Sequence, residues 1–169
     1  KPVYVGHSEA FANLKKALVG GDDSLAADLP MESYSKVCEN WGHCATGEVI
    51  KRGDRGVNFL ARVYSPDVWE GDMNSMTSLK RTVYKFHTCS NLPDNSREGR
   101  AGKLREKALS ALCNDANTPI LGPFCRAAAE ATKNIKSGTG DTSYWSYDQP
   151  EDCYPNEGEW MYAELEHEL

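Results

Sequence analysis

The chain has 169 residues, of which 40% are hydrophobic and 26% are charged, and its formal net charge at pH 7 is −6. This size and apolar content predict a single domain, residues 1–169, with a core of its own. No apolar run reaches the roughly 20 residues that cross a bilayer, which excludes a membrane-spanning helix, and the acidic balance argues against a nucleic-acid partner.

The N-terminal part of the chain predicts one packing helix over residues 7–21. Ser8 can cap its start, Phe11 and Leu14 recur on one face, and Gly20-Gly21 end it. A polar connection with the sequence GGDDSLAADLP follows, and it leads into the next stretch.

The densest stretch of the sequence is YSKVCENWGHCATGEVI, residues 34–50, which holds two cysteines, a tryptophan and a histidine. From there to residue 89, β-branched and aromatic residues come in short runs separated by turn residues. Strands are expected at 48–51, 57–64 and 82–88, with turns at 53–54 and 65–67. These elements predict a small antiparallel sheet at about 48–90.

A helical hairpin is expected after the sheet. Its first helix covers Ala101 to Leu112, and its second begins near Pro123, a residue tolerated in a first helical turn, and continues to Gly138. The fold class predicted from all these elements is α+β, with the sheet packed against the N-terminal helix and the hairpin.

The last segment, residues 141–169, is acidic and rich in aromatic residues. No Lys or Arg follows Lys136, whereas nine Asp and Glu do, so the preceding body is mildly basic. The aromatic residues argue against disorder. We therefore expect an ordered segment that wraps the basic body and is attached through Cys153.

The six cysteines are even in number and spread along the chain, which favours three disulfides and an oxidising compartment. The sequence cannot choose among the 15 pairings of six cysteines. The cysteines expected to staple the fold are Cys38, Cys44, Cys89, Cys113, Cys125 and Cys153.

An alternative hypothesis assigns catalysis to one of these cysteines. Cys44 would be a nucleophile, His87 its base and an acid such as Asp54 or Asp67 the residue that orients the base, with the cysteine before the histidine as in papain-like amidases and peptidases. The even cysteine count argues against it, because a free nucleophile leaves an odd partner among the other five. Whether Cys44 is bonded or free decides between the two readings.

Weaker motifs add no cofactor or metal to the prediction. Cys38, His43, Cys44 and His87 lack the spacing of a zinc site, and Glu157 and Glu159 with Arg52 only loosely resemble ADP-ribosyltransferases, whose middle element is missing. The tripeptide at 52–54 and the final four residues are short enough to be coincidental matches to integrin and retrieval signals.

The function predicted from these observations is that of a secreted, disulfide-stabilised effector or toxin-like protein, extracellular or periplasmic and monomeric, that takes part in virulence by binding a host protein or a cell surface. The alternative is a secreted cysteine hydrolase. The expected binding surface combines basic and aromatic side chains, namely Arg97, Arg100, Lys103, Arg105, Trp145, Tyr147 and Trp160.

Overall fold

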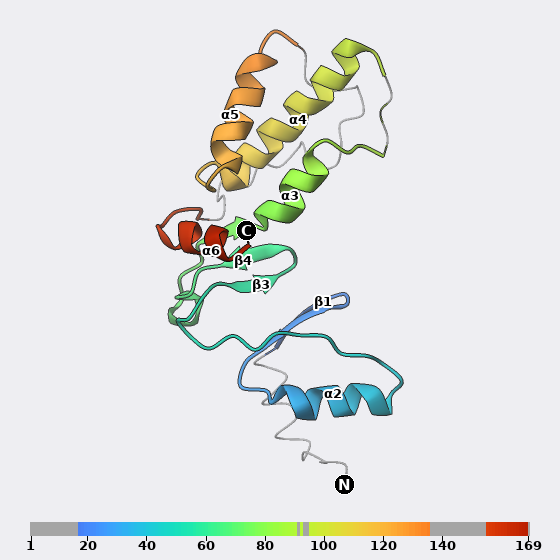
Figure 1. The fold of residues 1–169 in the computed structure, drawn as a ribbon, viewed down its shortest axis with the longest axis vertical. Helices are drawn as coiled ribbons and strands as arrows, with labels where there is room; N and C mark the ends of the chain where they lie inside the picture. Colours follow the sequence, from blue (N-terminus) through green and yellow to red (C-terminus); the bar gives the residue numbers. More distant parts are fainter. Residues whose placement is uncertain (1–16, 91, 93–94, 136–154, 169) are drawn as a thin grey trace. The chain divides into compact units, whose positions relative to one another are not determined.

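The structure, a computed structural model, describes residues 17–90, 92, 95–135 and 155–168 (Figure 1). Within these ranges the fold is α+β, with five α-helices, one short 3-10 helix and two small antiparallel sheets. The chain divides into two compact units, residues 1–51 and 52–169, and each is described by itself. The single domain expected from chain length stays a prediction.

The N-terminal unit contains a β-hairpin of β1 (Ala17–Gly20) and β2 (Asp23–Ala26), which pair in antiparallel fashion. Gly21 and Asp22 form its two-residue turn, and Gly21 has a φ of 71°, in the left-handed region that favours glycine. The helix predicted at 7–21 is therefore wrong over residues 17–21, because the glycines form a hairpin turn instead of ending a helix. Residues 7–16 lie outside the described residues.

The dense stretch at 34–50 is partly helical. Helix α2 (Met31–Asn40) begins after Pro30. Beyond its end, Gly42 has a φ of 76°, and its amide donates a hydrogen bond to the Glu39 carbonyl oxygen (3.0 Å), which closes the last turn. The strand predicted at 48–51 is wrong, because these residues have no strand partner in the described chain.

The C-terminal unit holds a three-stranded sheet in the order β3 (Val57–Phe59), β4 (Arg62–Tyr64), β5 (Ser75–Thr77). A single strand was expected at 57–64, but Leu60 and Ala61, with φ values of 51° and 62°, form a tight turn in its middle. A short 3-10 helix, η1 (Val68–Glu70), follows the expected turn at 65–67.

Helix α3 (Leu79–Phe86) stands where a strand was expected at 82–88, and that prediction is wrong. Leu79 and Phe86 are seven residues apart, so they share one helix face, and both are buried. They join a core cluster with Ala108, Leu121 and Cys125.

The predicted helical hairpin is confirmed as α4 (Arg97–Asp115) and α5 (Leu121–Ala131). The Ser96 hydroxyl caps α4 by accepting a hydrogen bond from the Gly99 amide (3.0 Å). Phe86 of α3 packs edge-on against Phe124 of α5, with ring centroids 5.0 Å apart.

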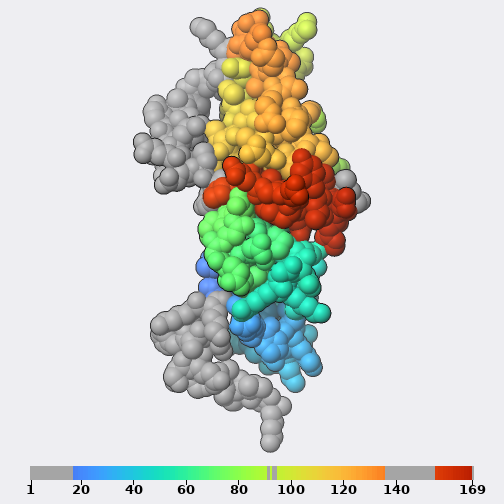
Figure 2. Space-filling model, turned by 90° about the vertical axis from the view of Figure 1, so that its left-hand side faces the viewer, coloured from blue at the N-terminus to red at the C-terminus, as the bar shows by residue number. Residues whose placement is uncertain are grey.

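Helix α6 (Trp160–Glu168) lies between the sheet and the helices of the C-terminal unit (Figure 2). Met161 packs with Val63 and Met76 of the sheet, whereas Leu165 packs against the helical cluster. The expected wrap at 141–169 stays a prediction as a whole, because residues 141–154 lie outside the described residues.

The disulfide framework is wrong for the cysteines that the structure describes. Cys38, Cys44, Cys89, Cys113 and Cys125 form no disulfide, and Cys153 lies outside the described residues. Cys125 is fully buried in the helical cluster and acts there as a small hydrophobic side chain. An even cysteine count therefore does not indicate disulfides in this chain, since cysteine also serves in ordinary cores. Within the described helices, none is long and apolar enough to cross a bilayer.

Candidate functional site

The β1–β2 turn presents two adjacent aspartates. Asp22 is the second residue of the two-residue turn and Asp23 is the first residue of β2, paired across the hairpin with Gly20. Both aspartates are exposed. Apart from Gly21 itself and its two chain neighbours, no described atom lies within 4 Å of the position that a Cβ would take at Gly21, so the tip of the hairpin is open.

Two neighbouring carboxylates suit a hard divalent cation. Mg²⁺ prefers oxygen ligands and is usually bound by one or two carboxylates together with water and substrate phosphates. Among the residues that the structure describes, no cluster of three or more His, Cys, Asp and Glu could hold a metal. Two carboxylates are the protein ligands that such a magnesium site usually has.

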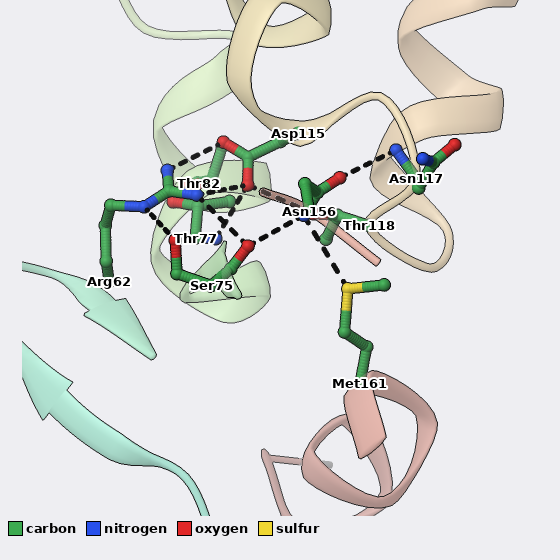
Figure 3. A network of polar contacts seen from close by, with 9 residues as sticks. All are labelled: Arg62, Ser75, Thr77, Thr82, Asp115, Asn117, Thr118, Asn156 and Met161. Carbon is green, nitrogen blue, oxygen red and sulfur yellow. Dashed lines mark hydrogen bonds and ion pairs between the residues drawn. The ribbon is translucent and has the colours of Figure 1, made fainter. Parts of the chain in front are cut away.

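The densest polar cluster of the C-terminal unit has a different character (Figure 3). Asp115, at the end of α4, is buried, and its carboxylate accepts hydrogen bonds from both Nη atoms of Arg62 (3.1 and 3.3 Å). It also accepts from the Thr77 amide (2.8 Å) and the Thr118 hydroxyl (3.0 Å). The arginine and the carboxylate thus tie β4 and β5 to the end of α4.

Asn156 extends this cluster to the chain that precedes α6. Its amide nitrogen donates to the Ser75 carbonyl oxygen (2.8 Å) and to the Thr118 hydroxyl (3.0 Å), and its oxygen accepts from the Asn117 amide (2.8 Å). The Ser75 amide in turn donates to the Pro155 carbonyl oxygen (2.9 Å). Since these groups satisfy one another's hydrogen bonds, the cluster holds the unit together.

The three residues of the cysteine-hydrolase hypothesis do not form a site within either unit. Cys44 belongs to the N-terminal unit, whereas His87 and Asp54 belong to the C-terminal unit. His87 follows α3 and packs edge-on against Phe86, with ring centroids 5.9 Å apart, and Asp54 lies in an exposed turn.

The residues of the expected binding surface are partly engaged within the chain. Lys103 forms an ion pair with Glu106 (2.7 Å), and Arg105 donates to the Ala129 carbonyl oxygen (2.8 Å). Arg100 donates to the Asn95 side chain (3.3 Å), and Trp160 donates to the Glu157 carbonyl oxygen (3.0 Å). Arg97 opens α4 and is exposed, while Trp145 and Tyr147 lie outside the described residues.

The aspartates of the hairpin were not selected from the sequence, although a signal was present. The apolar runs ALV and SLA flank Gly-Gly-Asp-Asp, and Gly-Asp as a two-residue connection is typical of hairpins. A helix over residues 7–21 uses the same glycines as its end and places the aspartates in the polar connection that follows.

Comparison with known proteins finds a similar sequence in a viral polymerase. No protein-family model matches the chain, and neither does any solved structure. The chain is 32% identical over 144 residues to an RNA-directed RNA polymerase of Pieris rapae virus. The match covers 83% of this chain and spans 14% of that polymerase, so it is longer than the C-terminal unit and includes part of the N-terminal unit.

This similarity overturns the function predicted from composition and cysteines. Because the chain resembles a viral polymerase, the prediction of a secreted effector or toxin-like protein with a role in virulence is wrong. The predicted host or cell-surface partner and the extracellular or periplasmic location are wrong for the same reason. The alternative of a secreted cysteine hydrolase is wrong as well. The argument against nucleic acid also fails, since net charge describes the whole chain and not a local surface. Whether the chain is a monomer stays a prediction.

Proposed function

We propose that this chain is a portion of a viral RNA-directed RNA polymerase, in which Asp22 and Asp23 hold divalent metal for nucleotide addition. The observation that carries the proposal is the pair of exposed carboxylates at an open hairpin turn, in a chain that resembles a polymerase of this kind. Because the match spans 14% of that polymerase, we propose that this chain belongs to a larger protein.

The chemistry of polymerases explains why such a pair is useful. In polymerases, two bound metal ions stabilise the attacking and leaving oxygens of the phosphoryl transfer. Asp22 and Asp23 would bind from the protein side, and the incoming triphosphate would supply further oxygens. The hairpin would contribute rigidity, because its paired strands fix the backbone on both sides of the turn.

Exposed apolar side chains in the N-terminal unit support the idea of a larger protein. Leu18 and Val19 of β1 are 58% and 71% exposed, and Trp41 and Val49 are 79% and 73% exposed. An isolated two-stranded hairpin is marginally stable in water. Burial of these side chains against other parts of a polymerase would stabilise the hairpin that carries the aspartates.

The role of the aspartates is tested by titrating the chain with Mn²⁺ in the presence of a nucleoside triphosphate, and following paramagnetic broadening of backbone amide signals by NMR. We expect broadening centred on residues 21–23, and we expect its loss in the double variant Asp22→Asn, Asp23→Asn. Glu32→Gln, an exposed acid in the first turn of α2, is the matched control. Equal broadening in the double variant and the wild type would refute the metal-binding role.

A further inference from the structure

The outer face of α3 carries an exposed aromatic side chain among cations. Tyr84 is 84% exposed, more than any other large hydrophobic side chain that the structure describes. Lys80, Arg81 and Lys85 are also exposed, and α3 contains no acidic residue. Residues three and four apart are neighbours on a helix surface, so Tyr84 lies beside Lys80 and Arg81, with Lys85 next to it in the chain.

Two adjoining hollows border this face. One, of about 350 Å³, is lined by Ser78, Lys80, Arg81, Tyr84 and Lys85. The other, of about 530 Å³, lies between α3 and α4. Arg81 and Lys85 line both hollows, so the two form one continuous basic surface with Tyr84 on its outer side.

The second hollow adds polar groups and further cations from α4. Ser110 and Asn114 line it together with Thr82 of α3, and they can donate or accept hydrogen bonds. Lys103 and Lys107 also line it. The hollow is thus suited to a polar, negatively charged chain.

The side chains of the three α3 cations have no partner among the described residues, whereas the two α4 lysines that line the second hollow form hydrogen bonds or ion pairs within the chain. Lys107 donates to the carbonyl oxygens of Lys85 (3.1 Å) and Phe86 (3.2 Å) at the end of α3, and Lys103 pairs with an acid of its own helix. By contrast, the side chains of Lys80, Arg81 and Lys85 form no hydrogen bond or ion pair with any described residue.

Three acids lie near this surface, and each has a partner. Glu106 pairs with Lys103, Asp115 is bound by Arg62, and the Glu168 carboxylate accepts from the Lys80 backbone amide (3.1 Å). The local charge of the surface is therefore positive, although the whole chain has a net charge of −6.

We propose that the α3 face binds single-stranded RNA, with a base stacked on Tyr84 and the neighbouring phosphates held by Lys80, Arg81 and Lys85. Proteins that bind single strands combine a basic groove with aromatic side chains on which bases stack. A duplex keeps its bases stacked on one another, so it gains little from an exposed tyrosine. The inference rests on the proposed function, because a polymerase directed by RNA must hold an RNA strand.

The experiment measures binding of the full 169-residue chain to a fluorescent single-stranded oligoribonucleotide of about 12 nucleotides, within the usual range of single-strand sites, by anisotropy in EDTA. Tyr84→Ala is expected to weaken binding by about tenfold, which corresponds to the loss of one stacked base. Tyr84→Phe keeps the aromatic ring and should stay within about twofold of the wild type, since stacking needs only the ring face. Tyr162→Ala, which removes a 61% exposed tyrosine of α6, is the control and should not change binding.

Charge is tested separately with the double variant Arg81→Gln, Lys85→Gln. Two lost phosphate contacts should reduce the slope of log affinity against log salt by about 1.4, as expected for single strands. Binding that is unchanged by Tyr84→Ala, or equally tight to an RNA duplex, would overturn the proposal. Competition by polyglutamate at equal charge concentration, with no dependence on Tyr84, would show a general acidic-polymer site instead and would also overturn it.

Failure of this inference is distinguishable from failure of the proposed function. RNA binding is measured in EDTA, and metal binding at residues 21–23 is measured without RNA, so either result can fail without the other. Loss of metal binding at residues 21–23 with intact RNA binding would refute the metal-binding role alone.

Discussion

Removing the charge of Asp115 should destabilise the C-terminal unit strongly. Its buried carboxylate accepts four hydrogen bonds, two of them from Arg62. Asp115→Asn keeps the shape of the side chain but replaces one acceptor oxygen by a donor that faces other donors, and it removes the negative charge beside Arg62. Breaking a buried ion pair from one side costs about 3–5 kcal/mol. Because the Arg62 side chain is 19% exposed and can be partly hydrated, we expect about 3 kcal/mol.

The assay is urea denaturation followed by the helical circular-dichroism signal, which comes mostly from α3 to α6. A loss of this size lowers the midpoint by at least about 1 M, given the usual denaturant dependence of small domains. Asp67→Asn, at an exposed carboxylate of the same unit, is the control and should stay within about 0.5 kcal/mol of wild type. If Asp115→Asn unfolds at the same urea concentration as this control, the polar cluster does not hold the unit together.

Two further predictions concern buried groups of the C-terminal unit. The Glu164 carboxylate is buried and accepts a hydrogen bond from the Gly56 amide (2.6 Å), so Glu164→Ala should cost about 1–3 kcal/mol in the same urea assay. Glu166→Ala, at an exposed residue of α6, should lower the free energy of unfolding far less. Equal losses in the two variants would contradict the role of Glu164 in joining α6 to Gly56, the residue before β3. Burial, aided by the nearby Asp115 charge, raises the pKa of the Cys125 thiol, so in the folded chain at pH 8 iodoacetamide should modify exposed Cys44 well before Cys125. The Cys125 thiol stays protonated to a higher pH in the folded state than in the unfolded state. The free energy of unfolding should therefore fall as pH rises above the ordinary cysteine pKa of about 8.5. Replacing Cys125 by Ala should abolish that part of the pH dependence, and equally fast modification of both thiols would contradict the assigned burial.

The helical hairpin was predictable because its signals are long and regular. In the first helix, Leu104, Ala108 and Leu112 keep helical spacing, and in the second, Pro123 falls in the first turn. Such a repeated pattern outweighs the weak preferences of single residues. Helix α4 extends three to four residues beyond the expected helix at each end, whereas α5 ends at Ala131, seven residues before the expected end.

The sheet region was harder to predict because its decisive residues carry ambiguous signals. Leu60 and Ala61 form a tight turn with positive φ, which residues of these types adopt only with strain, so no turn was visible between the strands. The run TVYKFHT favours a strand by composition, but Leu79, three residues before it, completes a helical face with Phe86. Packing of that face against α4 and α5 overrides the local preference.

The candidate site was missed for a related reason. Asp22 and Asp23 lie at a turn whose geometry depends on Gly21, and the same glycines also fit the end of a helix. The cysteines give a stronger sequence signal than the aspartates, because an even count in a chain of this size commonly means disulfides. The α3 surface is not predictable from a strand at 82–88. Alternation along such a strand places Tyr84 on the inward face with Phe86, whereas the helix exposes Tyr84.

The measurement that tests the central claim most directly is RNA-templated nucleotide incorporation by the larger polymerase of which we propose that this chain is a portion. Metal ions contribute several kcal/mol to such a transfer, so Asp22→Asn is expected to lower the rate by at least about 100-fold. The matched control Glu32→Gln should retain the wild-type rate, since Glu32 belongs to α2 and not to the turn. Incorporation at the wild-type rate by Asp22→Asn, with the protein folded, would contradict the assignment of the hairpin to the metal site.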